Sequence, residues 1–273
     1  MSCPCCPPPA SEYRRFFGRK LAGHELRRYR RKGLPKTARA LAAAVDGDTV
    51  LDIGGGVGDL SLALLERGAS RATVVELSDG YEEAAAELLA EHRLGDRVER
   101  RTGDFVAEAG LVEPHDVVLL HRVVCCYPDA DRLVSTASTH ARRSLAMTYP
   151  RERALTRIGF RGINLWLAAT RCGFRTFVHP FAVLEAAARR EGLTLAHRET
   201  QGLIWENAVW LRDDADGNTA GMEPRHQDFA AEEVARDRQA EPDEMDQSGA
   251  NVVDDLNPDE DDTGYDDEID DEG

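Results

Sequence analysis

A glycine-rich turn and three acidic residues are the features of this sequence whose spacing could support chemistry. The turn reads Asp52-Ile-Gly54-Gly-Gly56-Val-Gly58 and directly follows a short apolar run. Glycines let the backbone turn sharply and bring main-chain N–H groups close to a ligand. Glu76 and Asp104 follow two later β-branched or alternating runs. The pattern predicts a ligand site built on backbone groups and carboxylates.

The same turn argues against a nicotinamide dinucleotide as the ligand. The dinucleotide fingerprint G-x-G-x-x-G would place its third glycine at position 59, where Asp59 stands. Asp52 would also lie close to a bound pyrophosphate, and the two negative groups would repel each other. An ammonium or sulfonium group would instead be attracted. The turn therefore favours a cationic ligand.

Alternating strands and helices between residues 46 and 212 must position these residues. Short β-branched or apolar runs predict seven strands, at 49–53, 72–76, 97–101, 116–120, 145–149, 193–199 and 203–211. Helical stripes lie between most of them, with a helix over 181–192 and an irregular stretch before it. Strands separated by helices imply a parallel sheet covered on both faces. The last two strands are joined by only residues 200–202, so they must be antiparallel. We expect an α/β, doubly wound, mostly parallel sheet with an antiparallel edge strand.

In such an open sheet the ligand lies beyond the carboxyl ends of the strands. Glu76 ends the second strand, 18 residues after Gly58, where it could accept hydrogen bonds from both hydroxyls of a ribose. Asp104 follows the third strand and could accept from an adenine amino group, with Phe105 beside it to cover the ring. The plain alternative is a set of solvated acids at strand ends. The three acids in register behind one glycine turn favour a nucleoside site.

These motifs resemble those of class I S-adenosylmethionine-dependent methyltransferases. The resemblance rests on VLDIGGGVGDL (50–60), VVELS (74–78), TGDF (102–105) and DVVLLHRVVCCYPD (116–129), and it spans about residues 34–212. It implies a Rossmann-like, seven-stranded sheet of order 3-2-1-4-5-7-6 with the seventh strand antiparallel. It also implies S-adenosylmethionine as cofactor.

Carried over position by position, the resemblance assigns roles to ten residues. The methionine end of the cofactor would be held by Asp52, Gly54, Gly56 and Gly58. Glu76 would bind the ribose with Leu77 beside it, Asp104 and Phe105 would hold the adenine, and His121 with Arg122 would line the floor.

The fourth motif bears on the methyl acceptor. Many nucleic-acid amino-methyltransferases carry Asn/Asp-Pro-Pro-aromatic at this point, whereas this chain has His121-Arg-Val-Val. It looks more like the small-molecule branch of the family. A fainter likeness to magnesium-protoporphyrin O-methyltransferases rests on VVCCYPDADRLV (123–134), ALTRIG (154–159) and LIWENAVWLRD (203–213).

Methyl transfer from a sulfonium is an in-line displacement in which positioning can supply much of the rate. A general base is needed only if the acceptor is not already ionised. His121 is the best-placed candidate for a catalytic base; the alternative, which is favoured, is a wall residue that only packs on the cofactor. Tyr149 and His179 are weaker candidates.

Residues 151–180 are expected to select the acceptor. They contain six arginines, with Phe160, Trp166, Phe174 and Phe177 between them. Arginine forks suit carboxylates or phosphates, and aromatic faces suit a flat ring. The alternative is a solvated helix whose stripe from Leu165 to Ala169 packs on the domain.

Residues 12–45 form a basic arm that offers a second function. Leu34, Ala38, Leu41 and Val45 at helical spacing predict that its second half packs on the domain. Aromatic residues alternate with arginines in this arm, where they could stack the bases of an RNA; they are Tyr13, Phe16, Phe17 and Tyr29. A methyltransferase of RNA or protein, and a non-catalytic binding module, are therefore kept as alternatives. The interpretation of the arm as a helix pair that caps the cofactor is favoured.

The formal net charge of −16 is unevenly distributed. Residues 213–273 hold 24 acidic residues and three arginines, while residues 46–212 are close to neutral. We expect this acidic tail and the Pro/Cys leader (1–11) to be disordered. No run approaches the ~20 apolar residues of a membrane span and no signal-peptide core follows Met1, so a cytoplasmic protein is expected.

The cysteines predict neither a disulfide framework nor a metal site. Those at positions 3, 5 and 6 are crowded by prolines, Cys125 and Cys126 are adjacent, and Cys172 stands alone. Cys3-Pro-Cys-Cys lacks the second spaced pair that a tetrahedral metal site requires.

Overall fold

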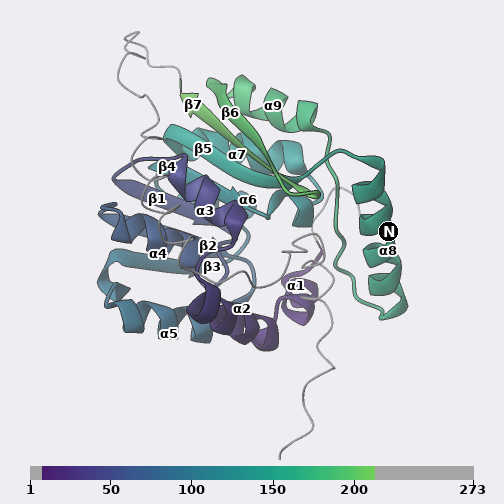
Figure 1. Cartoon of the computed structure of the whole chain (residues 1–273), viewed down its shortest axis with the longest axis horizontal. Coiled ribbons are helices and arrows are strands. Elements are labelled where there is room, and N and C mark those ends of the chain that lie inside the picture. Colours follow the sequence, from purple (N-terminus) through teal and green to yellow (C-terminus); the bar gives the residue numbers. More distant parts are fainter. Residues whose placement is uncertain (1–7, 213–273) are drawn as a thin grey trace, which may run out of the picture. The chain divides into compact units, whose positions relative to one another are not determined.

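The computed structural model describes residues 8–212. The acidic tail (213–273) and most of the predicted leader lie outside these residues. The chain builds a seven-stranded sheet of order β3-β2-β1-β4-β5-β7-β6, which confirms the predicted order (Figure 1). The strands are β1 (Thr49–Ile53), β2 (Arg71–Glu76), β3 (Val98–Thr102), β4 (His115–His121), β5 (Ala141–Pro150), β6 (Leu193–Gln201) and β7 (Trp205–Arg212).

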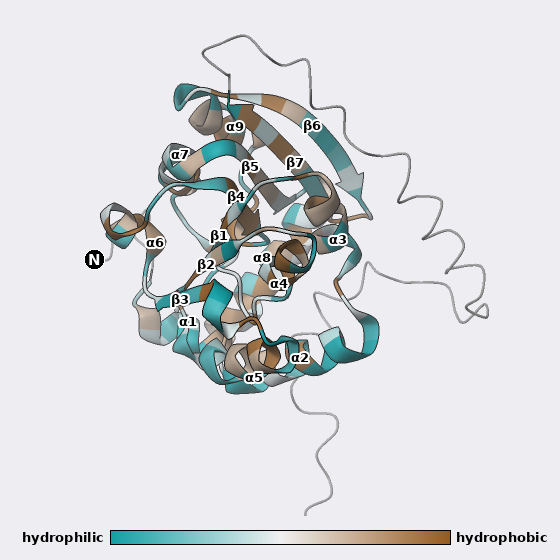
Figure 2. Cartoon of the chain, turned by 90° about the vertical axis from the view of Figure 1, so that its left-hand side faces the viewer, coloured by the Kyte–Doolittle hydropathy of each residue, from teal (hydrophilic) through white to brown (hydrophobic). Residues whose placement is uncertain are grey.

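Strand β7 is the reversed strand, and it lies one place in from the edge. It pairs antiparallel with β5 on one side and with β6 on the other. The pairing of Ser144 with Leu211 joins residues far apart in the sequence. Strand β7 is mostly buried, whereas the edge strand β6 alternates between exposed and half-buried residues, and Figure 2 shows the second half of β6 in hydrophilic colours.

The helices cover both faces of this sheet. They are α1 (Ala10–Phe16), α2 (Arg19–Lys32), α3 (Lys36–Ala43), α4 (Asp59–Glu66), α5 (Glu82–His92), α6 (Phe105–Glu108), α7 (Ala130–His140), α8 (Ala154–Ala169) and α9 (Phe181–Arg190). One core joins the strands to α6, α7 and α9, and a second joins them to α3 and α4. Successive β1 residues alternate between the two: Leu51 and Ile53 enter the first core, and Val50 enters the second.

The basic arm packs on the domain as predicted for its second half. Ala38 and Leu41 of α3 are fully buried against α4 and the sheet, and Val45 is nearly so. Ala22 and Leu26 of α2 pack on α5. Helix α1 begins at Ala10, two residues before the predicted start of the arm.

The stretch 151–180 is not irregular as the sequence pattern predicted, because it contains the 16-residue helix α8. Phe160 and Leu167 are its buried anchors, whereas Leu165 is 74% exposed. The predicted packing of a stripe that starts at Leu165 is therefore wrong. The buried side of α8 faces residues 172–178, which run back along it in extended backbone.

Candidate functional site

The glycine turn joins β1 to α4 and needs glycine for conformational reasons. Gly54, Gly56 and Gly58 have φ of +67°, +53° and +85°, the left-handed region that other residues adopt only at a cost. A Cβ on Gly54 would lie 2.5 Å from the side chain of Val123, and one on Gly56 would lie 3.3 Å from the Tyr81 ring. Gly58 caps the start of α4. The turn thus brings bare backbone to the carboxyl edge of the sheet.

Asp52 lies directly behind this turn and is buried. Its Oδ2 accepts a hydrogen bond from the Ser61 hydroxyl of α4, at 2.7 Å. Its Oδ1 has no partner among the described residues. Burial raises the pKa of Asp52 to about 7, although the Ser61 hydrogen bond opposes the shift. A buried carboxylate oxygen without a partner is costly, and a donor or cation at the turn would satisfy it.

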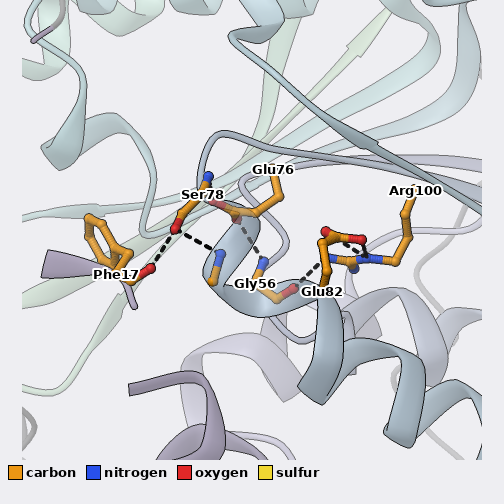
Figure 3. A network of polar contacts seen from close by, with 7 residues as sticks. Phe17, Gly56, Glu76, Ser78, Glu82 and Arg100 are labelled. Carbon is orange, nitrogen blue, oxygen red and sulfur yellow. Dashed lines mark hydrogen bonds and ion pairs between the residues drawn. The ribbon is translucent and has the colours of Figure 1, made fainter. Parts of the chain in front are cut away.

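Glu76 holds the turn from the end of β2 (Figure 3). Its carboxylate accepts from the Gly56 N–H at 3.1 Å and from the Ser78 N–H at 2.9 Å. Burial raises its pKa, while these backbone hydrogen bonds act in the opposite direction. Arg100 of β3 completes the frame by donating to the Gly56 carbonyl and to Glu82, at 3.0 Å each. Both polar groups of Gly56 are therefore fixed by side chains from neighbouring strands.

A cavity of about 310 Å³ opens beside Glu76, at the carboxyl ends of β2 and β3. Leu77, Gly103 and Asp104 line it, together with Arg14 and Asp79. Asp104 caps α6 by accepting from the Val106 N–H at 2.9 Å, and the Tyr127 hydroxyl donates to its Oδ2 at 3.3 Å. Leu77, predicted beside the ribose, and Asp104, predicted at the adenine, both line this cavity.

Phe105 does not share this position. Its ring is buried in the core and meets the ring of His140 edge-on, with centroids 5.2 Å apart. As the first residue of α6 it points toward α7 rather than into the cavity. The prediction that it covers an adenine ring disagrees with this packing.

His121 ends β4 at the carboxyl edge, where it contacts the arm. Its Nε2 is 3.0 Å from the hydroxyl of Thr37 on α3, and Arg122 donates to the same hydroxyl at 3.3 Å. Burial lowers the pKa of His121 well below its ordinary value, and the charges of Arg122 and Arg28 act in the same direction. The imidazole is therefore neutral at pH 7.

The two weaker candidates for a catalytic base, Tyr149 and His179, are both held by packing contacts. Tyr149 is buried in β5 with its ring stacked on Phe181, and desolvation raises its pKa. His179 donates from Nε2 to the Tyr127 carbonyl at 3.0 Å, and burial lowers its pKa. Both side chains take part in the packing around α9 and the segment before it.

Helix α1 and the turn that follows it pack over the loops after β2 and β4. The Tyr13 hydroxyl donates to the Cys126 carbonyl at 2.9 Å, and the Ser78 hydroxyl donates to the Phe17 carbonyl (Figure 3). The rings of Tyr13, Phe16 and Phe17 gather around Phe174 with centroids 4.8 to 5.5 Å away from it. Tyr13 is buried in this cluster. Tyr13 therefore packs inside the protein, and Phe16 and Phe17 are half-buried beside it.

A second cavity, of about 360 Å³, lies on the flank of α8. Arg157, Phe160 and Arg161 line it from the helix, and Phe177 lines it from the returning segment. Asn164 fixes that segment by accepting from the Thr176 N–H and donating to its carbonyl, at 2.8 Å each. The Phe177 N–H donates to the Cys125 carbonyl at 2.7 Å, which connects this cavity to the loop after β4. Of the predicted acceptor-selecting aromatics, Phe160 and Phe177 are here, Phe174 is buried elsewhere and Trp166 lies on the outer face.

Several residues of the site have no sequence motif that could have marked them. Ser61, Arg100 and Thr37 contact Asp52, Gly56 and His121 from other elements. Only the spacing of Ser61, nine residues after Asp52 and one turn into α4, could have suggested such a contact.

Comparisons with known proteins agree with this geometry. Residues 50–145 match a family model described as a methyltransferase domain. No curated protein sequence matches the chain. Among solved structures, magnesium protoporphyrin IX methyltransferase from Synechocystis PCC 6803 with bound S-adenosylmethionine is 20% identical, with a TM-score of 0.51 over 74% of this chain and 90% of that one.

Two further structural neighbours have the same fold. An O-methyltransferase family protein from Burkholderia thailandensis is 17% identical, with a TM-score of 0.58 over 71% of this chain and 59% of that one. An O-methyltransferase family 2 protein from Planctomyces limnophilus, in complex with apigenin, is 17% identical, with a TM-score of 0.54 over 71% of this chain and 62% of that one.

The matched segment contains the glycine turn, Glu76, Asp104 and His121, so the family match and the site coincide. Residues 50–145 therefore match a methyltransferase domain, and the chain has the Rossmann-like fold of these structural neighbours. S-adenosylmethionine, which is bound in the Synechocystis neighbour, is the cofactor that the four motifs predict for this chain.

Proposed function

We propose that this enzyme moves the methyl group of S-adenosylmethionine to an oxygen or nitrogen of a small, anionic and planar acceptor. The observation that carries the cofactor half of the proposal is Asp52, whose buried Oδ1 has no partner directly behind a turn of left-handed glycines. A carboxylate in this state suits the ammonium end of the cofactor. Gly54, Gly56 and Gly58 would give the methionine end its close approach to backbone.

Glu76, Leu77 and Asp104 would hold the rest of the cofactor. Glu76 already fixes the Gly56 N–H, so a ribose that bonds to its carboxylate would be tied to the position of the turn. The cavity lined by Leu77 and Asp104 gives the adenine an apolar wall and an acceptor. Phe105 is left out of this site because its ring belongs to the core.

The arginine cavity on α8 supports the acceptor half. Arg157 and Arg161 lie on the same flank of the helix beside the rings of Phe160 and Phe177. Guanidinium forks bind carboxylates or phosphates, and ring faces bind flat molecules. The backbone link from Phe177 to Cys125 connects this cavity to the end of β4, where the transfer would occur.

S-adenosylmethionine supplies an electrophilic methyl carbon on a sulfonium. The part of the chain is to hold an acceptor atom in line with that carbon and to exclude water with the arm. An acceptor that arrives ionised needs no base. For a neutral acceptor, His121 is the candidate base: its lowered pKa keeps the imidazole uncharged before the transfer, and Thr37 would hold its orientation.

The two alternatives make different demands on the structure. An RNA or protein methyltransferase guided by the arm would need its aromatics at an outer surface, whereas Tyr13 is buried against Phe174. A non-catalytic module would need no cofactor site. A thermal shift with S-adenosylmethionine separates it from an enzyme, since a module with a degraded pocket should show none.

A metabolite-extract assay with isotopically labelled S-adenosylmethionine tests the proposal. We expect a labelled small anionic product that Arg161→Ala reduces and Arg153→Ala leaves unchanged, since Arg153 does not line the cavity. Label that appears in RNA or protein instead would contradict the small-molecule acceptor. Cofactor affinity, measured in parallel by calorimetry, should be the same in all three proteins.

A further inference from the structure

The outer face of α8 is apolar and exposed. Among the described residues, six large hydrophobic side chains are exposed, and four of them lie on this one helix: Leu155 (75%), Ile158 (62%), Leu165 (74%) and Trp166 (46%). Isolated surface hydrophobics are common, but a contiguous group marks an interaction surface. Neither proposed binding site uses these side chains.

The spacing makes the group continuous. At 3.6 residues per turn, positions 155, 158, 162, 165, 166 and 169 fall on one side of the helix, opposite the buried Phe160 and Leu167. The other residues on this side of the helix are small: Gly159, Gly162 and Ala169, all of them exposed. Helix α8 is therefore apolar on two opposite faces, and only one of them packs on the domain.

The charges around this face are almost all positive. Residues 151–180 contain six arginines and one glutamate, Glu152, which pairs with Arg157 at 2.5 Å. Arg153 and Arg171 lie just outside the two ends of α8 and are exposed, and Arg161 is exposed on its flank. A second copy of the chain on this face would bring like charges together, which disfavours self-association. An anionic apolar partner complements both properties.

We infer that the outer face of α8 binds the surface of an anionic lipid bilayer. The helix would lie in the plane of the headgroups, with its large apolar side chains entering the acyl boundary and its arginines close to lipid phosphates. Figure 1 shows α8 on the outside of the fold, separated from the sheet, so its outer face is accessible to a flat surface. No helix among residues 8–212 is long and apolar enough to cross a membrane.

Most of the excess acidity behind the formal net charge of −16 belongs to residues 213–273. Within residues 151–180, by contrast, the only acidic residue is Glu152, so the charged residues in and beside α8 suit an anionic surface.

Vesicle sedimentation of the full chain tests this inference. We expect binding to phosphatidylcholine vesicles that contain phosphatidylglycerol, and much weaker binding to pure phosphatidylcholine. Ile158→Asn together with Leu165→Asn should lower the partition coefficient by about tenfold or more, since two apolar side chains leave the interface. Leu111→Asn with Leu203→Asn is the matched control, because both leucines are similarly exposed away from α8.

Tryptophan emission gives a second readout. The chain has three tryptophans, and Trp205 and Trp210 are buried. A blue shift on adding anionic vesicles should therefore come from Trp166 and disappear in Trp166→Phe, which should still sediment with vesicles. Arg153→Glu should weaken binding to anionic vesicles and make it less sensitive to salt.

Three results would overturn the inference. One is equal sedimentation of the wild-type chain and the Ile158→Asn/Leu165→Asn variant. Another is a wild-type dimer that ignores vesicles and becomes a monomer in that variant, which would make α8 an interface between copies. The third is a Trp166 emission already blue-shifted without lipid and red-shifted by salt, which would indicate that the acidic residues 213–273 cover the helix. Unchanged cofactor affinity in every variant shows that the fold is intact.

Discussion

The proposed cofactor side and the proposed acceptor side of this chain would recognise their ligands in different ways. At the ends of β1 and β2, buried carboxylates and backbone N–H groups form the proposed site, and side chains from β2 and β3 fix the turn. At α8, arginines and aromatic rings on a peripheral helix line a cavity. The first site is specified by backbone shape, which few substitutions can preserve. The second is specified by side chains, which can change without altering the fold.

The strongest test of the cofactor side is Gly56→Val. A β-branched residue is strained at a φ of +53°, and its Cβ would lie 3.3 Å from the Tyr81 ring. We expect loss of measurable S-adenosylmethionine binding in calorimetry, together with a lower melting temperature. Gly110→Val is the control, because a Cβ at Gly110 meets nothing within 4 Å. A normal dissociation constant for Gly56→Val would show that the turn is not the cofactor site.

Asp52 predicts a pH dependence of stability. Burial raises its pKa from 3.8 in the unfolded chain to about 7, so the folded state favours the protonated form. The contribution of the protonated Asp52 to the free energy of unfolding is complete below about pH 4. It is lost as the pH rises toward 7, by roughly 1.4 kcal/mol per pH unit. In urea unfolding of the cofactor-free chain, Asp52→Asn should remove this contribution to the pH dependence of the free energy of unfolding.

Bound S-adenosylmethionine should reduce the pH dependence of the free energy of unfolding in the wild-type chain, because its ammonium group favours the ionised carboxylate of Asp52. A slope that is identical in the wild-type chain and Asp52→Asn would contradict the assigned environment of Asp52.

Glu76→Gln should weaken cofactor binding by about tenfold to a hundredfold, since a charged hydrogen bond to the ligand is worth ~1.5–3 kcal/mol. Glu76→Ala should also destabilise the fold, because the Gly56 and Ser78 N–H groups would lose their acceptor. Calorimetry and thermal melts separate the two effects. Glu99→Gln, on the exposed side of β3, should change neither quantity.

On the acceptor side, Arg161→Ala should raise the KM for the acceptor by about tenfold and leave the cofactor dissociation constant unchanged. This result would sharpen the contrast between the two sides. A matching loss of cofactor affinity would show that they are one continuous site.

The smallest expected effect belongs to Tyr13 on α1, which packs over the proposed cofactor site. Tyr13→Phe removes the hydrogen bond to the Cys126 carbonyl, worth about 1 kcal/mol, and should speed cofactor release by a few-fold in stopped-flow experiments. Tyr29→Phe, on α2, is the control. An unchanged release rate for Tyr13→Phe would mean that α1 does not retain the ligand.

The sequence could predict the strands and the acids at their ends, because short apolar runs between helical stripes leave one topology in which Asp52, Glu76 and Asp104 share an edge. It offered a helix within residues 151–180 only as an alternative to an irregular stretch, because a helix that is apolar on two opposite faces lacks the single stripe that identifies one. The direction of the Phe105 ring and the contact of Arg100 with Gly56 depend on tertiary packing that no local pattern encodes.

The interior position of β7 also bears on how the chain folds. Its residues pair with β5 across more than fifty residues of intervening sequence, and Trp210 completes the same core as Leu145 and Met147. During synthesis, β1 to β4 can associate early, but β5 keeps an unpaired hydrogen-bonding edge until residues 205–212 arrive. A nascent chain paused before β7 therefore exposes an aggregation-prone strand, and its final strand is the one that removes the hazard.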